Sequence, residues 1–271
     1  MRFFSCLGKL AGPALLVLVA CSGPDSASHS PAAAPPAPAA PATTAQSAAA
    51  PVSSVTRQPL ALTQLPAALR PQGRLLEAWR WPDANGENTL VVSRTVVADD
   101  AATEDGRTAR LLARQYVRHG GSYRVLWQLQ DAVEACPLDL TLGLLPGSTS
   151  VSDLDGNGRT ETTLVYALAC RGGVDPSYLK LIMREGAAKY ALRGEAIELI
   201  GNPEEVARAR RQAAGPTCCA ADAVPDSLYW RNNGLYESEK DFAAAPPAFL
   251  AFAQQQWRKW RTRADENTEV Q

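Results

Sequence analysis

Histidine is scarce in this sequence, and so are the motifs on which many enzyme families depend. The chain has two histidines among 271 residues, and His119 is the one that lies outside the N-terminal low-complexity region. A serine or cysteine triad would have to use His119, which falls between two predicted strands, and a zinc site would have only this one histidine as a ligand. There is also no Gly-x-Ser-x-Gly elbow, no Gly-Lys-Ser/Thr phosphate loop and no Gly-x-Gly-x-x-Gly turn. These absences argue against the common nucleophilic, nucleotide-binding and zinc-dependent classes.

An excess of charge of either sign is absent as well. The formal net charge is −1, and basic and acidic residues are interspersed, so the sequence predicts no nucleic-acid partner. Beyond the first 20 residues, no apolar run reaches the roughly 20 residues that a membrane-spanning helix needs. No internal repeat of fixed period is present.

The first 20 residues have the three zones of a secretory signal. Arg2 and Lys9 supply positive charge, residues 10–19 are almost wholly apolar, and the small residue Ala20 follows. A segment of this kind is removed from the mature protein and takes no part in its fold. The sequence therefore predicts a signal peptide over residues 1–20.

The last four residues up to Cys21, Leu-Val-Ala-Cys, resemble a bacterial lipobox. This resemblance implies cleavage before Cys21 and acylation of its thiol, so that lipid holds the protein on a membrane. Stable attachment requires more than one acyl chain. Ser22 follows the cysteine, which by the same resemblance favours the outer membrane, facing the periplasm or the cell surface. The alternative is a plain cleaved signal followed by an incidental cysteine.

Residues 21–58 form a predicted tether behind the lipidated cysteine. They are nearly all Ala, Pro, Ser and Thr, with no aromatic residue and only Asp25 and Arg57 charged. Such a segment buries too little apolar surface to offset the entropy of ordering, so we expect it to be disordered. Its proline content favours an extended spacer that lifts a folded domain off the membrane.

Residues 59–263 have the size of one ordinary domain, and 264–271 read as a disordered tail. Short runs of strand-forming residues alternate with turn signals such as Asn85-Gly86. The predicted antiparallel pairs are 75–81 with 89–97, 111–118 with 123–130, 138–145 with 161–170, and 178–184 with 189–193. The expected fold is mainly β: an antiparallel meander forming an open curled sheet or a partial barrel, with C-terminal α-helices.

Two helices are predicted near the C-terminus. Residues 203–214 read as a short charged helix that Asn202 caps. Residues 246–263 place aromatic side chains at mostly three- and four-residue spacing, which indicates a face packed on the sheet rather than a ligand site.

The sharpest local motif is the segment 153–161, Asp-Leu-Asp-Gly-Asn-Gly-Arg-Thr-Glu. Oxygen donors recur at alternate positions, and the two glycines permit a tight backbone curl. Calcium takes six to eight oxygen ligands from carboxylates, amides and carbonyls. The predicted ligands are the side chains of Asp153, Asp155, Asn157 and Glu161 and the carbonyl of Arg159.

This loop resembles the first nine positions of an EF-hand loop, but Leu164 stands where that family has a bidentate glutamate. Because strand-forming residues follow the loop, it is more similar to the strand-to-strand calcium loops of FG-GAP and integrin-type repeats. The resemblance implies a structural calcium ion. The alternative is a metal-free turn in which the aspartates bond the backbone.

Four cysteines remain after the signal and the lipidated residue are set aside, and four cysteines allow three pairings. Cys136 and Cys170 lie nearly symmetrically about Asp153, as cross-strand neighbours would, and this favours a disulfide between them. Cys218 and Cys219 are adjacent, and their pairing stays open. No Cys-x-x-Cys redox motif is present.

Several segments together are similar to a poorly characterised family of bacterial envelope proteins, some of which are labelled surface polysaccharide biosynthesis proteins. The similarity covers about 75–262, and the segments that carry it are 81–88, 131–139, 153–161, 170–177, 179–183 and 189–194. It implies an envelope role and identifies no catalytic residues.

Arg171, Asp175 and Lys180 gather polar groups beside the predicted disulfide and loop, and they form a candidate binding surface; a plain turn at 175–177 is the alternative. The segment 229–233, Tyr-Trp-Arg-Asn-Asn, offers aromatic rings for stacking on a sugar, or packs as a loop. We therefore expect a non-enzymatic binding or scaffolding domain whose partners are envelope polysaccharide or its assembly proteins. The alternative is an envelope glycan hydrolase or transferase with paired carboxylates.

Overall fold

A computed structural model describes residues 53–98, 106–173, 175–223 and 225–263. Cys21, the signal peptide, most of the tether and the tail 264–271 lie outside the described residues. The elements of the N-terminal half are β1 (Ser53–Ser54), β2 (Gln58–Pro59), η1 (Leu62–Gln64), η2 (Ala67–Leu69), β3 (Arg74–Asp83), β4 (Gly86–Ala98), β5 (Arg107–His119) and β6 (Ser122–Cys136).

The remaining elements belong to the C-terminal half of the described chain. They are β7 (Asp139–Leu144), β8 (Ser150–Asp153), β9 (Glu161–Arg171), β10 (Tyr178–Glu185), β11 (Ala188–Glu195), β12 (Ile197–Glu198), α1 (Pro203–Ala213), η3 (Asp226–Asn232), η4 (Lys240–Phe242), α2 (Pro247–Trp260) and β13 (Thr262–Arg263). The predicted mainly β class with C-terminal α-helices is confirmed.

The strands form two large antiparallel sheets, neither of which closes into a barrel. One sheet has five strands in the meander order β2-β3-β4-β5-β6. The other has six strands in the order β1-β8-β9-β10-β11, and β7 pairs with β9 alongside β8. All four predicted strand pairs occur as β3–β4, β5–β6, β7–β9 and β10–β11. A short parallel pair joins β12 to β13.

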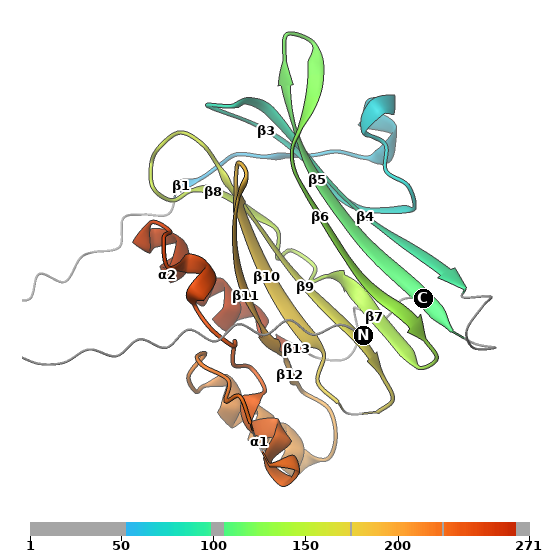
Figure 1. The fold of residues 1–271 in the computed structure, drawn as a ribbon, viewed down its shortest axis with the longest axis vertical. Coiled ribbons are helices and arrows are strands. Elements are labelled where there is room, and N and C mark those ends of the chain that lie inside the picture. Colours follow the sequence, from blue (N-terminus) through green and yellow to red (C-terminus); the bar gives the residue numbers. More distant parts are fainter. Residues whose placement is uncertain (1–52, 99–105, 174, 224, 264–271) are drawn as a thin grey trace, which may run out of the picture. The chain divides into compact units, whose positions relative to one another are not determined.

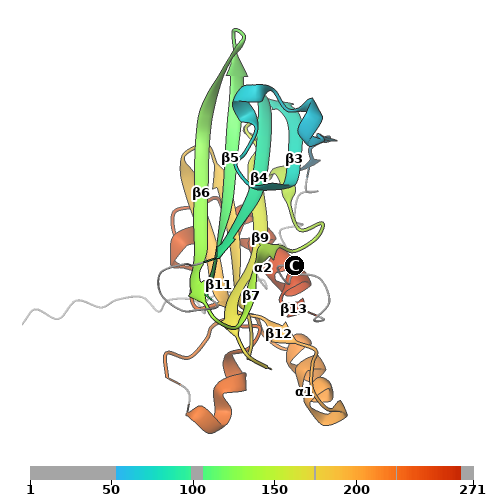
Figure 2. The same ribbon diagram turned by 90° about the vertical axis from the view of Figure 1, so that its right-hand side faces the viewer.

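The two sheets pack face to face (Figures 1 and 2). One cluster of buried apolar side chains draws its members from both sheets. The five-stranded sheet contributes residues such as Trp81, Leu90 and Leu111, and the six-stranded sheet contributes Leu164 and Tyr166. Alternate side chains along a strand point to opposite faces, so each sheet has a second face to cover.

Helix α2 covers the other face of the six-stranded sheet (Figure 1). Phe249, Phe252 and Trp257 are buried there against strand residues such as Val165 and Leu181. The aromatic spacing of this segment therefore reflects packing, as predicted. On the far side of the five-stranded sheet, the 3₁₀ turns η1 and η2 cover a smaller apolar cluster.

The short helix α1 begins where the sequence predicted. Asn202 accepts hydrogen bonds from the backbone N–H groups of Glu204 and Glu205 at 3.0 Å, and Glu205 bonds back to Asn202 N–H at 2.8 Å. This reciprocal capping box satisfies backbone donors at the helix start. Among the described residues, no helix is both long enough and apolar enough to cross a bilayer.

The end of the predicted tether belongs to the folded part. Ser53 and Ser54 pair with Asp153 and Ser152 of β8, and Gln58 pairs with Arg80 of β3. The prediction of disorder up to residue 58 is therefore wrong for residues 53–58. Backbone pairing on a sheet edge needs no apolar side chains, so composition did not reveal it.

Candidate functional site

The loop between β8 and β9 curls as its alternating donors predicted. The N–H of Asn157 donates to Asp155 Oδ1 at 3.2 Å, and the N–H of Gly158 donates to Asp153 Oδ2 at 3.1 Å. Gly156 and Gly158 have φ angles of +71° and +79°, which L side chains rarely adopt. The loop thus folds back so that its first residue and its last come close together.

Three carboxylates converge in this loop. One oxygen each from Asp153, Asp155 and Glu161 lies within 4.8 Å of the other two. Glu161 has no exposed surface; its Oε2 accepts from Leu154 N–H at 2.9 Å and from Ser152 Oγ at 3.1 Å. Glu161 Oε1 and Asp153 Oδ1 are buried without a hydrogen-bond partner among the described residues. Buried oxygens without partners are costly, and a cation would satisfy them.

Burial also changes the protonation of Glu161. It raises the pKa of Glu161 from 4.5 to about 7, since desolvation disfavours the charged form and the carboxylate of Asp155 adds repulsion. Hydrogen bonds from Leu154 and Ser152 offset part of this increase in the pKa. A divalent cation would favour the charged form and reverse the shift.

The other two predicted ligands lie differently. Asn157 is exposed, and its Oδ1 already accepts from Arg159 N–H at 2.7 Å. Its Nδ2 donates to Asp155 Oδ2 at 3.0 Å and to Glu185 Oε1 at 2.5 Å. Asn157 therefore stabilises the loop through hydrogen bonds in this arrangement, and Arg159 is an exposed residue. The donors that converge are all oxygens, and this carboxylate cluster fits a metal ion.

The loop also connects the two sheets. Asp83, at the β3–β4 turn of the five-stranded sheet, accepts from Thr160 N–H at 3.1 Å and from Thr160 Oγ1 at 2.8 Å. Trp81 Nε1 donates to Thr160 Oγ1 at 2.9 Å, and Ala84 N–H donates to the Gly158 carbonyl at 2.7 Å. Sequence reasoning missed these partners because they lie more than 70 residues away and carry no local signal.

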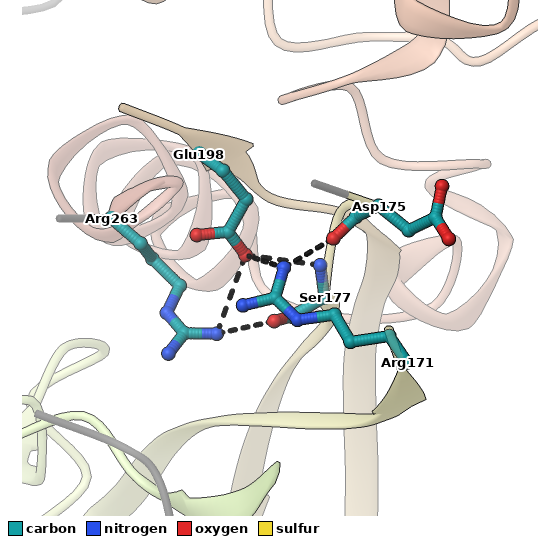
Figure 3. A network of polar contacts seen from close by, with 5 residues as sticks. All are labelled: Arg171, Asp175, Ser177, Glu198 and Arg263. Atoms are coloured by element: carbon teal, nitrogen blue, oxygen red, sulfur yellow. Dashed lines mark hydrogen bonds and ion pairs between the residues drawn. The ribbon is translucent and has the colours of Figure 1, made fainter. Parts of the chain in front are cut away.

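Arg171, one of the predicted surface residues, belongs to a buried polar network (Figure 3). Its Nη1 lies 3.2 Å from Glu198 Oε1, which also lies 3.5 Å from Arg263 Nη1 and accepts from Ser177 N–H at 3.0 Å. Arg171, Glu198 and Arg263 are each at most 8% exposed. The Asp175 carbonyl accepts from Arg171 Nη1, while the residue itself is exposed. The network ties the end of β9 to β12 and β13.

Lys180 lies on the opposite face of the six-stranded sheet. Its Nζ is 2.6 Å from Asp131 Oδ2 of β6, and Tyr166 Oη donates to the same oxygen at 2.8 Å. Because Lys180 pairs with Tyr166 in register, both side chains lie on the face that points toward the other sheet. Arg171 is five positions from Tyr166 on the same strand, so its side chain lies on the opposite face. The structure therefore brings Arg171 and Asp175 together but separates them from Lys180.

The disulfide between Cys136 and Cys170 is present, with the two Cα atoms 5.5 Å apart. It does not join neighbouring strands of one hairpin, because Cys136 ends β6 of the five-stranded sheet and Cys170 lies in β9 of the other. The bond thus links the two sheets. The adjacent cysteines Cys218 and Cys219 are bonded to each other.

Comparison of the chain with protein families, with curated proteins and with solved structures returns no match. The lipobox, the calcium-loop resemblance and the envelope-family similarity therefore stay predictions.

Proposed function

We propose that this chain is a lipid-anchored envelope protein whose β-rich part is a non-enzymatic binding or scaffolding domain, stabilised by calcium and serving surface polysaccharide biogenesis. The observation that carries the calcium part is Glu161, a fully buried carboxylate with one orphaned oxygen, facing two further carboxylates. The envelope part rests on Cys21 and on the similarity described above.

Calcium suits the donors better than other common metals. All converging atoms are carboxylate oxygens, which hard cations prefer, whereas zinc selects nitrogen and sulfur. Three carboxylates leave room for backbone carbonyls and water to complete the six to eight ligands of calcium. Magnesium usually keeps several waters and binds through one or two carboxylates, so three converging carboxylates favour calcium.

The metal would act on structure rather than on a substrate. Glu161 has a raised pKa of about 7, as a general acid needs, but no part of its side chain is exposed. Its neighbours instead link β8, β9 and the β3–β4 turn, so a bound ion would lock the connection between the sheets. A glycan hydrolase or transferase would need its acid in contact with solvent-accessible substrate.

Calorimetric titration of the full-length chain with calcium tests the metal claim. We expect a binding heat, competition by magnesium only at much higher concentration, and loss of the heat in Glu161→Gln. Glu134→Gln, which changes a carboxylate whose side chain is 70% exposed on β6, is the matched control and should bind as the wild type does. No heat and no rise in melting temperature at millimolar calcium would remove the claim.

Metabolic labelling with an alkyne-tagged fatty acid tests the anchor. We expect label on the wild-type chain and none on Cys21→Ala, which should also stay uncleaved. Incubation with envelope glycans tests the non-enzymatic role, and turnover that disappears when one carboxylate is replaced would overturn it.

A further inference from the structure

Outside the carboxylate loop, a groove of about 450 Å³ lies between helix α1 and the segment that ends η3. Arg208, Arg211 and Gln212 of α1 form one wall, and Trp230, Arg231 and Asn233 contribute to the other. Residues three and four positions apart share a helix face, which explains why Arg208, Arg211 and Gln212 line the groove together. Trp230 and Arg231 belong to the segment whose aromatic rings suggested sugar stacking.

The groove is rich in positive charge. Arg208, Arg211 and Arg231 have no ion-pair partner within the described part of the chain, and no acidic residue lines this groove. The guanidinium of Arg208 lies 5.3 Å from the centre of the Trp230 ring. The nearby carboxylate of Glu205 already accepts a hydrogen bond from the N–H of Asn202, the N-cap of α1, at 2.8 Å. Guanidinium groups bind carboxylate and phosphate oxygens in paired hydrogen bonds, so the groove favours an anion.

The walls are held in place before any ligand arrives. Arg261 is fully buried and donates to the carbonyls of Ala213 at 2.9 Å, Gly215 at 2.7 Å and Gly234 at 3.1 Å, and also to the Pro216 carbonyl. Gln212 Nε2 donates to the Trp230 carbonyl at 2.6 Å and joins the two walls. A groove fixed in this way loses little entropy on binding.

Trp230 adds an aromatic face to this positively charged groove, beside the guanidinium of Arg208. A ligand that combines an anionic group with a flat ring face for Trp230 is an acidic sugar. We infer that the α1–η3 groove binds an anionic saccharide through Arg208, Arg211 and Trp230.

This inference deepens the proposed binding role and rests on it for the choice of a saccharide. The test is calorimetric titration of the full-length chain in detergent with trigalacturonate, glucose 6-phosphate and maltotriose. The first two carry a carboxylate and a phosphate, and the third is neutral. We expect at least one anionic probe to bind, more weakly at high salt, and maltotriose to bind much less.

Arg208→Gln/Arg211→Gln should weaken anion binding by about tenfold or more, because charge-assisted hydrogen bonds are lost. Arg210→Gln is the matched control: Arg210 is exposed on the same helix but does not line the groove, and its loss should change affinity less than about twofold. No anionic binding, equal binding of maltotriose, or an unchanged double variant would overturn the inference. Calcium binding is measured on the same samples. If calcium binds and the anionic probes do not, only the inference about the groove is wrong; if neither binds, the calcium part of the proposed function is wrong as well.

Discussion

The two ends of strand β9 bury glutamates in opposite surroundings. Glu161, the first residue of β9, faces Asp153 and Asp155, whereas Glu198 contacts Arg171, the last residue of β9, and Arg263. A buried carboxylate is costly unless a cation compensates it. At the Arg171 end the chain supplies the cations itself. At the Glu161 end, as we propose, calcium supplies the charge, so one end carries its own countercharges on folding and the other depends on solution conditions.

Glu198→Gln is expected to have the largest effect. It removes the carboxylate that Arg171 and Arg263 contact, and breaking a buried pair in this way lowers the free energy of unfolding by about 3–5 kcal/mol. Urea denaturation with and without calcium measures the loss, which should be the same in both. Glu134→Gln should change the stability by less than about 0.5 kcal/mol. If Glu198→Gln and Glu134→Gln changed the free energy of unfolding by similar amounts, the Arg171 end of β9 would not depend on its buried ion pairs.

Removing the disulfide should weaken the same end of β9 somewhat less. Cys136→Ala/Cys170→Ala opens a link over a sequence separation of 34, and such a bond contributes about 2–4 kcal/mol, largely by constraining the unfolded chain. The measurement is again urea denaturation, paired with a calcium titration. If the two ends are independent, the double variant still gives the binding heat; loss of that heat would mean that the ends are coupled.

Calcium should act at the other end. At a calcium concentration 100 times the Kd, binding to the folded state alone raises the free energy of unfolding by about 2.7 kcal/mol. Glu161→Gln should lose most of this gain, since it removes a ligand charge, and should be at least as stable as wild type in EDTA because the buried charge is gone. If the wild-type chain were equally stable in EDTA and in calcium, the proposal that calcium stabilises the Glu161 end of β9 would be wrong.

The smallest expected effect is a pH dependence of the calcium-free protein. The folded-state pKa of Glu161, about 7, is above its ordinary value, so its contribution to stability is full below about pH 4.5 and is lost as the pH rises through 7. In EDTA, the free energy of unfolding should therefore fall by roughly 1 kcal/mol between pH 6 and pH 7. Melting temperatures of wild type and Glu161→Gln across this range check it: the slopes should differ, and identical slopes would refute the assignment.

Much of the secondary structure was predictable because its signals are local. Turn residues and alternating apolar positions marked the four strand pairs, and Asn202 marked the start of α1. The division of the strands into two facing sheets was not predictable, since strand order depends on contacts between residues far apart in the chain. The Cys136–Cys170 pairing was predicted correctly. That this disulfide links two different sheets was not predicted, because it too depends on contacts between residues far apart in the chain.

The candidate binding surface of Arg171, Asp175 and Lys180 shows that strand register determines which side chains lie on the same face of a sheet. Arg171 and Lys180 are nine positions apart, and each is polar, so they looked like neighbours. A strand places successive side chains on opposite faces, and the β9–β10 pairing puts Lys180 beside Tyr166, toward the other sheet. Arg171 therefore joins Glu198, and Lys180 joins Asp131.

The sequence by itself determined the chemistry of the loop: oxygen donors at 153, 155 and 161 and glycines that let them meet, because spacing and backbone freedom are local properties. The lipid anchor at Cys21 is a prediction that rests on the sequence alone. Only the tertiary structure decided that Glu161 is buried, that Asp83 and Thr160 join the loop to the second sheet, and that Arg208 meets Trp230. Burial and long-range contacts arise when distant segments pack, and they determine whether a carboxylate is an ordinary surface group or needs a cation.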